Sequence, residues 1–157
     1  MRILSAHVGT RGDTQPHIAL AIALSRAGHQ VRLHLPPDYE PLVPKGVVNM
    51  SVVAQPVWVK DFWDKPGVQK ALSTGNTNKM LALMFEDMAN VDGYKRMTDS
   101  VMDEVEQWKP DVIMSSGLMV YNTALVARFF DIPLVVAAVQ PTIPTEEFFT
   151  FGGSFEV

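Results

Sequence analysis

Short apolar runs alternate with longer segments of helical periodicity along most of the chain. The apolar runs predict strands over Arg2–Val8, Gln30–Leu35, Val47–Ala54, Asp111–Ser115 and Pro133–Val139. Between them, apolar residues that recur every three or four positions predict helices over residues 15–27, 77–108 and 117–130. This alternation is typical of a parallel sheet with helices on both faces. We therefore expect an α/β fold, a Rossmann-like open sheet of about five parallel strands.

Residues that break regular structure refine these boundaries. Gly28 is free to adopt a left-handed cap and should end the first helix. A break near Asp92–Gly93 should divide the long helical segment in two. Residues 55–76 hold prolines, glycines and aromatic residues without a regular period, so we predict an irregular segment there. Met80 and Met84 lie one helical turn apart, a spacing that favours core packing over a binding surface.

The composition narrows the range of functions. A chain of 157 residues fits a single domain. Its formal charge of -4 and the lack of any lysine or arginine run argue against a nucleic-acid partner. The absence of cysteine excludes disulfides, thiolate metal sites and cysteine nucleophiles. No apolar stretch approaches the roughly 18–20 residues that span a bilayer, so we expect a soluble, cytoplasmic protein.

The turn between the first strand and the first helix carries the most chemical information. It reads Gly9-Thr10-Arg11-Gly12-Asp13-Thr14-Gln15-Pro16. In doubly wound sheets ligands bind where the strands end, and glycines let the backbone approach a ligand closely. The turn lacks the third glycine of the dinucleotide fingerprint and the Gly-Lys-Ser or Gly-Lys-Thr ending of a phosphate loop. Spacing alone therefore does not identify a nucleotide site.

Asp13 has two candidate roles in this turn. As a helix N-cap, its carboxylate would accept hydrogen bonds from the following backbone N–H groups and face the positive end of the helix dipole. As a general base, it would take the proton from an acceptor hydroxyl that attacks a sugar. Thr14 could cap the helix instead, which would leave Asp13 to face the crevice. The residue types alone leave both roles open.

Three stretches of the chain resemble one family of glycosyltransferases. The stretch Gly9–Ala23 reads GTRGDTQPHIALAIA and resembles the opening motif of sterol glucosyltransferases and of glycosyltransferases that act on antibiotic aglycones. It is also similar to the lipid-linked peptidoglycan glycosyltransferases, in which a histidine stands at the position of Asp13. The same family fits Ala27–Val43, AGHQVRLHLPPDYEPLV, and Lys109–Pro141, KPDVIMSSGLMVYNTALVARFFDIPLVVAAVQP. The resemblance covers both ends of the chain and weakens in the middle.

This resemblance implies the N-terminal half of a GT-B fold, in which two Rossmann-like domains face each other across a cleft. Enzymes of this kind transfer a sugar from a nucleotide donor, with UDP-glucose the expected donor here, to a hydroxyl. They invert the anomeric centre and normally use no catalytic metal. Asp13 matches their general base. The residues that match the turn beside the donor's phosphates and sugar, or lie next to it, are Gly9, Thr10, Arg11, Gly12 and Thr14.

The histidines carry weaker signals. His7 ends a strand that should be buried, which favours a core histidine over a ligand. His17 lies early in the first helix and faces either the cleft or solvent. His29 and His34 lie near the second strand, and no two histidines share one element with metal-ligand spacing. We therefore expect no metal site.

Two further groups of residues are candidates for the site. Ser115, Ser116 and Gly117 follow the fourth predicted strand and either border the crevice or cap the next helix. The aromatic residues Trp58, Phe62 and Trp63 lie in the region where the resembled family varies with its acceptor. They either bind a lipophilic ring system or close the core beneath a long loop.

The donor-binding half is expected to lie elsewhere. The His-Gly-Gly-x-Gly motif of the family's C-terminal domain does not occur in the sequence. We expect residues 1–157 to form one acceptor-side domain, incomplete at its C-terminus, that needs a donor-binding domain in cis or in trans and transfers no sugar alone. The expected acceptor is small and lipophilic, such as a sterol, and peripheral membrane contact is an open alternative. A non-catalytic ligand-binding domain and an unrelated flavodoxin-like or nucleotide-binding domain are the other interpretations.

Overall fold

The computed structural model describes residues 1–88 and 90–139, which form one parallel sheet surrounded by helices. The strands are β1 (Arg2–Ala6), β2 (Gln30–Leu35), β3 (Met50–Ala54), β4 (Val112–Ser115) and β5 (Leu134–Val136). They lie in the order β3-β2-β1-β4-β5, and every neighbouring pair is parallel. The predicted open sheet of five parallel strands is confirmed.

Strand β1 lies at the centre of the sheet, where the strand order reverses. The chain runs outward through β2 and β3 and then crosses to β4 on the other side of β1. The register pairs Ile3 of β1 with Val31 of β2 and with Val112 of β4. A reversal of this kind opens a crevice at the carboxyl ends of the two central strands. The turn that follows β1 therefore borders this crevice.

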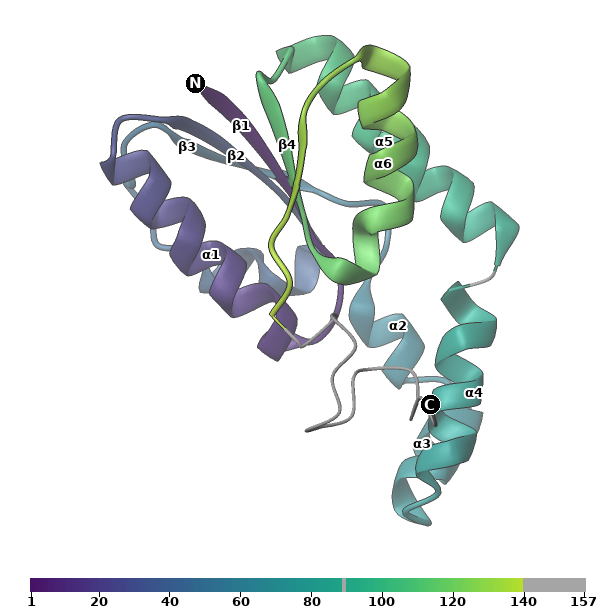
Figure 1. Cartoon of the computed structure of the whole chain (residues 1–157). Helices are drawn as coiled ribbons and strands as arrows, with labels where there is room; N and C mark the ends of the chain where they lie inside the picture. Colours follow the sequence, from purple (N-terminus) through teal and green to yellow (C-terminus); the bar gives the residue numbers. More distant parts are fainter. Residues whose placement is uncertain (89, 140–157) are drawn as a thin grey trace, which may run out of the picture.

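Helices cover both faces of the sheet, as predicted. The helical elements are α1 (Arg11–Arg26), η1 (Pro37–Leu42), α2 (Val59–Trp63), α3 (Pro66–Ser73), α4 (Thr77–Met88), α5 (Val91–Trp108), η2 (Gly117–Met119) and α6 (Val120–Phe130). Figure 1 shows α1 on one side of β1 and the pair α5 and α6 on the other. None of the helices within residues 1–88 and 90–139 is long and apolar enough to cross a bilayer.

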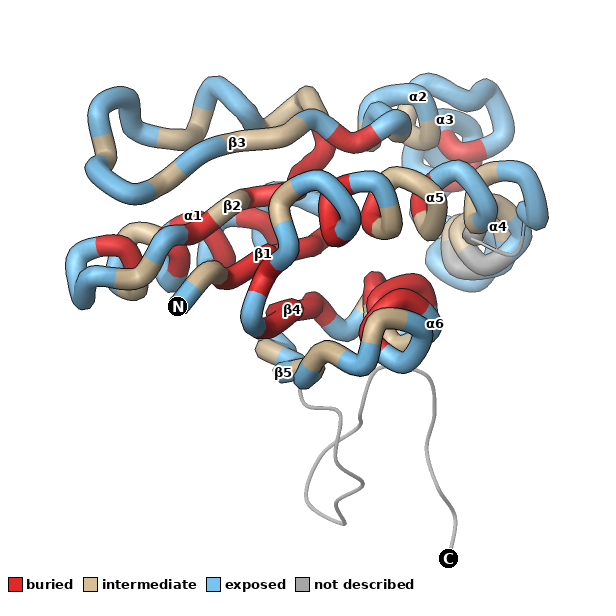
Figure 2. Tube along the Cα trace, turned by 90° about the horizontal axis from the view of Figure 1, so that it is seen from above, coloured by how far each residue is buried: buried red, intermediate tan, exposed pale blue. Residues whose placement is uncertain are grey.

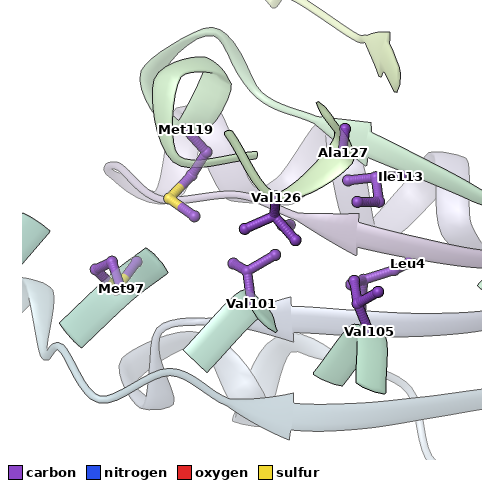
Figure 3. Close-up of a cluster of buried hydrophobic side chains, with 9 residues drawn as sticks. Leu4, Met97, Val101, Val105, Ile113, Met119, Val126 and Ala127 are labelled. Carbon is purple, nitrogen blue, oxygen red and sulfur yellow. The ribbon is translucent and has the colours of Figure 1, made fainter. Parts of the chain in front are cut away.

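Two hydrophobic clusters, one on each face, hold these layers together. Adjacent residues of a strand point to opposite faces, so Ile3 packs with Ile18 of α1 while Leu4 packs on the α5–α6 side. Figure 3 shows Val101 of α5 and Val126 of α6 meeting beside Leu4. Buried residues concentrate along β1, β2 and β4 (Figure 2), so the core lies along the centre of the sheet.

The structure moves two of the predicted helix boundaries. Helix α1 begins at Arg11 rather than near residue 15, because Thr10 occupies the N-cap position. Helix α4 ends at Met88 and α5 begins at Val91, so the division of the segment 77–108 comes slightly before the predicted break near residues 92–93. The Asn90 side chain accepts hydrogen bonds from the backbone N–H groups of Asp92 and Gly93, at 3.0 and 3.1 Å, and so starts α5. A side-chain cap, rather than the glycine, sets this boundary.

The segment 55–76 is helical where we predicted irregular structure. It contains α2 and α3, and Pro66 takes the first position of α3, where its missing N–H costs no hydrogen bond. The Asp38 side chain accepts a hydrogen bond of 2.7 Å from the Val59 N–H and thereby starts α2. We call residues 57–88, which hold α2, α3 and α4, the helical arm. Figure 1 shows α3 and α4 of this arm extending beyond the sheet.

Candidate functional site

The turn after β1 holds the Asp13 side chain in one orientation. Thr10 is the N-cap of α1, and Asp13 lies three positions later, in the first turn. The Thr10 N–H donates to Asp13 Oδ2 at 2.7 Å, and the Thr10 hydroxyl donates to the same oxygen at 2.9 Å. Asp13 is therefore not the N-cap, and neither is Thr14, whose side chain is buried. The carboxylate reaches back toward the N-cap, which is the arrangement of a capping box.

Gly9 is required for this orientation of the carboxylate. Its φ of +135° is a conformation that L-residues with a side chain rarely adopt. A Cβ atom at Gly9 would lie 2.5 Å from Asp13 Oδ2, well inside van der Waals contact. Gly9 therefore allows both the backbone conformation of the turn and the close approach of the Asp13 side chain.

Asp13 lies at the junction of two cavities although only 7% of its surface is exposed. The larger cavity, of about 310 Å³, also contacts Gly9 and Thr10 of the turn. The smaller one, of about 20 Å³, also contacts Ser116 and Gly117 after β4. The turn after β1 and the segment after β4 thus meet at the carboxyl edge of the sheet, as the strand order requires.

The larger cavity has a second wall, built by the helical arm. This wall consists of Trp58, Phe62 and Trp63 from α2 and its N-cap, with Met80 and Met84 from α4. We call it the aromatic cavity. A buried carboxylate and an apolar, aromatic wall thus face one space, which suits a lipophilic molecule that carries one hydroxyl.

Contacts within the arm hold the aromatic wall in place. The Phe62 and Trp63 rings meet edge to face with centroids 5.1 Å apart. The Lys60 ammonium lies 4.8 Å from the centre of the Trp58 ring. Lys65 at the start of α3 forms an ion pair with Asp87 near the end of α4. The wall is therefore a folded unit rather than a loose loop.

The structure separates the remaining residues of the predicted cleft. Arg11 and Gly12 are exposed and contact neither cavity. Ser115 is buried, where its hydroxyl donates to the Ser116 carbonyl at 2.9 Å and accepts from the Thr123 hydroxyl at 2.8 Å. These bonds give Ser115 a structural role between β4 and α6.

His17 faces neither the cleft nor solvent, because it is only 1% exposed. Its ring stacks on that of His7, with centroids 5.0 Å apart and planes inclined by 6°. Nearby, His34 contacts the Ser100 hydroxyl at 2.8 Å through Nε2. The expectation that His7 is a core histidine is confirmed by its full burial.

These three histidines are uncharged at neutral pH. Burial lowers the pKa of His7 to about 3, and the neighbouring rings of His17 and His34 add to the effect. Burial also lowers the pKa of His34 to about 4. The pKa of His17 is lowered by burial, against the opposing influence of the Ala137 backbone and of Asp13. The histidine cluster therefore packs beneath the turn without adding charge to the cavity.

Sequence reasoning missed the part of the wall that α4 supplies. The spacing of Met80 and Met84 favoured core packing, whereas both side chains line the aromatic cavity. Periodicity shows that a face is apolar but does not show whether another element covers it. Within the described residues, no group of three potential metal-ligating side chains converges.

Comparison of the sequence with known proteins identifies the family of this chain. A family model described as the glycosyltransferase family 28 N-terminal domain matches residues 3–146. The chain belongs to this family. The resemblance noted in the turn and at the two ends of the sequence is thereby confirmed, and the family 28 domain is a glycosyltransferase domain.

Two relatives share shorter stretches with this chain. A sterol 3-beta-glucosyltransferase of Pichia angusta is 35% identical over 77 residues, which are 49% of this chain and 5% of that protein. A vancomycin aglycone glucosyltransferase of Amycolatopsis orientalis is 45% identical over 53 residues, covering 33% of this chain and 13% of that protein. The matched stretches thus span a small part of these relatives.

Solved structures show the same fold at low sequence identity. A calicheamicin glycosyltransferase aligns with a TM-score of 0.65 and 20% identity, over 94% of this chain and 34% of that one. A Streptomyces glycosyltransferase complexed with thymidine diphosphate aligns with a TM-score of 0.57 and 22% identity, over 89% of this chain and 39% of that one. The sheet and its helices match the N-terminal half of GT-B glycosyltransferases.

Proposed function

We propose that this domain binds the acceptor of an inverting glycosyltransferase, with Asp13 as the general base. The observation that carries the proposal is that Asp13 and the aromatic wall line one cavity of about 310 Å³. Trp58, Phe62 and Trp63 supply flat apolar surface for a fused ring system. The Asp13 carboxylate lines the same cavity and would accept the proton of a hydroxyl at the edge of that ring system.

The proposed reaction is a single displacement. The acceptor oxygen attacks the anomeric carbon of the sugar, and its proton passes to the Asp13 carboxylate. The new bond joins that oxygen to the anomeric carbon, and the bond to the nucleoside diphosphate breaks on the opposite face, which inverts the centre. The Thr10 N–H and hydroxyl, at 2.7 and 2.9 Å, keep Asp13 Oδ2 in place while the proton is transferred.

The donor is proposed to be a nucleotide sugar held by a second domain. Gly9, Thr10, Ser116 and Gly117 border the two cavities at Asp13, where the sugar would lie beside the acceptor hydroxyl. The relatives support a nucleotide donor and a sterol-like or aglycone acceptor, and UDP-glucose with a sterol is our working pair. We expect no sugar transfer by this chain in isolation, because donor and acceptor must meet between two domains. Donor-dependent turnover by the pure 157-residue chain would contradict this.

A non-catalytic domain that only binds a lipophilic ligand is the second candidate function. The aromatic wall alone would serve such a role, since ring binding needs apolar area and no base. The two candidates differ at Asp13. A glycosyltransferase would require the Asp13 carboxylate for turnover, whereas a ligand-binding domain would not require it.

Ligand binding by the isolated chain is the experiment that tests the proposal. Trp58 and Trp63 line the cavity, so their fluorescence should change when a steroid alcohol such as estradiol is added. We expect saturable binding that Trp63→Ala weakens. Phe129→Ala, which removes a ring 71% exposed on α6 and outside both cavities, is the control and should bind normally. Preference for a flavin or a dinucleotide over the steroid would refute the proposal.

A further inference from the structure

Beside the two cavities at Asp13 lies another of about 270 Å³, between the first turns of α5 and α6. We call it the second cavity. It shares four lining residues with the aromatic cavity: Val8, Val57, Asp87 and Leu118. Two of these, Val8 and Leu118, also line the small cavity at Asp13. The two larger cavities therefore adjoin, and they meet beside the proposed general base.

The second cavity presents a different chemistry to its contents. Beside apolar residues, its lining includes Asn90, Arg96 and Asn122 together with Tyr94 and Tyr121. The aromatic cavity is lined instead by two tryptophans, a phenylalanine and two methionines. Tyrosine combines an apolar ring with a hydrogen-bonding hydroxyl, and amides both donate and accept. The second cavity thus suits a group that has both ring surface and several oxygens.

Asn122 is a fixed part of this lining. It is 6% exposed, and its Nδ2 donates to the Tyr94 carbonyl at 3.2 Å and to the Thr98 hydroxyl at 3.0 Å. The Tyr94 carbonyl can only accept, so the amide group must present Nδ2 to it. No hydrogen bond from the described residues reaches the Oδ1 atom of Asn122. This oxygen is therefore a preset acceptor for a hydroxyl.

Two charged side chains line the cavity, Asp87 and Arg96. Asp87 is engaged by Lys65, so the shared carboxylate is already neutralised. Arg96 is exposed and forms no ion pair within the described part of the chain, and its guanidinium offers donors without an acceptor. One preset acceptor and one flexible donor group match hydroxyls, which can both donate and accept.

We propose that the second cavity binds a sugar-like, hydroxyl-rich substituent of the same acceptor molecule whose apolar part fills the aromatic cavity. This inference rests on the proposed function and specifies its substrate class, an acceptor that already carries a polar ring. Tyr121, 75% exposed at the rim, covers one face of that ring, and Asn122 and Arg96 bind its hydroxyls.

The test compares estradiol with its 3-glucoside and its 17-glucoside. Binding to the isolated chain is followed by the fluorescence of Trp58 and Trp63 in the adjoining cavity. We expect at least one glucoside to bind about tenfold more tightly than estradiol, the gain of one or two added hydrogen bonds. Tyr121→Ala and Arg96→Gln should each reduce this preference several-fold while leaving the affinity for estradiol unchanged.

Matched controls lie on the same helix as Tyr121. Phe129→Ala and Arg128→Gln remove an exposed aromatic ring and an exposed guanidinium from α6 outside the cavity, and both should keep the preference. Estradiol binding without any preference for a glucoside would overturn this inference and leave the proposed function intact. Failure of all three steroids to bind would overturn both. Equal losses in the Tyr121 and Phe129 variants would likewise contradict a role for the cavity.

Discussion

The two walls of the aromatic cavity are built in different ways. The wall after β1 is a single stretch of chain, residues 9–13. It is held by hydrogen bonds from the N–H and the hydroxyl of Thr10 to the carboxylate of Asp13. The opposite wall combines residues 58–63 with residues 80–84, and its surface consists of long side chains. The first wall fixes the position of one carboxylate. The second fixes the shape of a space, and we infer that chemistry resides in the first and acceptor choice in the second.

Replacing the base should have the largest effect and tests the first half of this comparison. Asp13→Asn keeps an oxygen that accepts the hydrogen bond from the Thr10 N–H, so the turn should persist. Turnover by a two-domain enzyme containing this domain should fall roughly 10²- to 10⁴-fold, the usual contribution of one positioned general base. The initial rate of sugar transfer measures this.

The control for this variant is Asp92→Asn, which changes a carboxylate in the first turn of α5. It should leave turnover unchanged, because Asp92 contacts none of the three cavities around Asp13. If the Asp13 variant keeps its fold, as judged by circular dichroism, and also keeps wild-type turnover, the proposed role of Asp13 as the base is contradicted.

Crowding the turn should have the next largest effect. Gly9→Ala places a methyl group 2.5 Å from Asp13 Oδ2 and forces the carboxylate to move. A misplaced catalytic group can cost about 10²-fold in rate, and we expect a loss of that size. Kinetics of the same two-domain enzyme measure it.

Gly46→Ala provides the matched control. Gly46 also has a positive φ, of +77°, but no atom lies within 4 Å of the position of its Cβ. The Gly46 variant should lose about 1–2 kcal/mol of stability from the strain of a left-handed residue, and the Gly9 variant at least as much. Only the Gly9 variant should lose activity, and equal activities would show that the close approach to Asp13 is unimportant.

Trimming the aromatic wall should have a smaller and different effect. Trp63→Ala removes part of the surface that would contact an acceptor ring, worth about 1 kcal/mol or somewhat more. We expect KM for the acceptor to rise about tenfold with kcat little changed, because the base is untouched. A fall in kcat at unchanged KM would contradict the division of labour between the walls.

Acid should destabilise the buried histidine cluster beneath the turn. In the unfolded chain His7 and His34 titrate near pH 6.5. Burial lowers their pKa values to about 3 and about 4 in the folded chain. Below pH 6.5 the unfolded chain therefore binds protons that the folded chain does not. The free energy of unfolding should fall by about 2 kcal/mol between pH 6.5 and 5.5, measured by urea denaturation.

Variants of two histidines test whether the buried histidine cluster causes this acid sensitivity. His29→Gln should keep the steep pH dependence, because His29 lies outside the buried cluster. His7→Gln should show a shallower dependence, since one of the buried groups no longer titrates. Equal stability of the unmodified domain at pH 6.5 and 5.5 would contradict the buried, uncharged state of the cluster.

The sequence predicted the wall that is local. Of the other wall it named the aromatic residues as candidates and missed the methionines of α4. Gly9 and Asp13 are four positions apart, and their residue types already restricted the conformation and the chemistry of the turn. The capping role of Thr10 was missed because the helix start was placed four residues late. For α2 and α3, prolines and aromatic residues suggested an irregular segment, although Pro66 suits a first helical turn. The side-chain oxygen of Asp38, distant in sequence, starts α2.

The sequence by itself determined the layered α/β fold and the turn to which we assign the chemistry. Both follow from periodicity and from residue types that act within a few positions of one another. Only the tertiary structure decided that Asp13, the tryptophans and the methionines of α4 share one cavity, and that His17 is buried on His7. Such neighbours are set by the strand order and by helix packing, which join residues dozens of positions apart. No local pattern specifies those contacts.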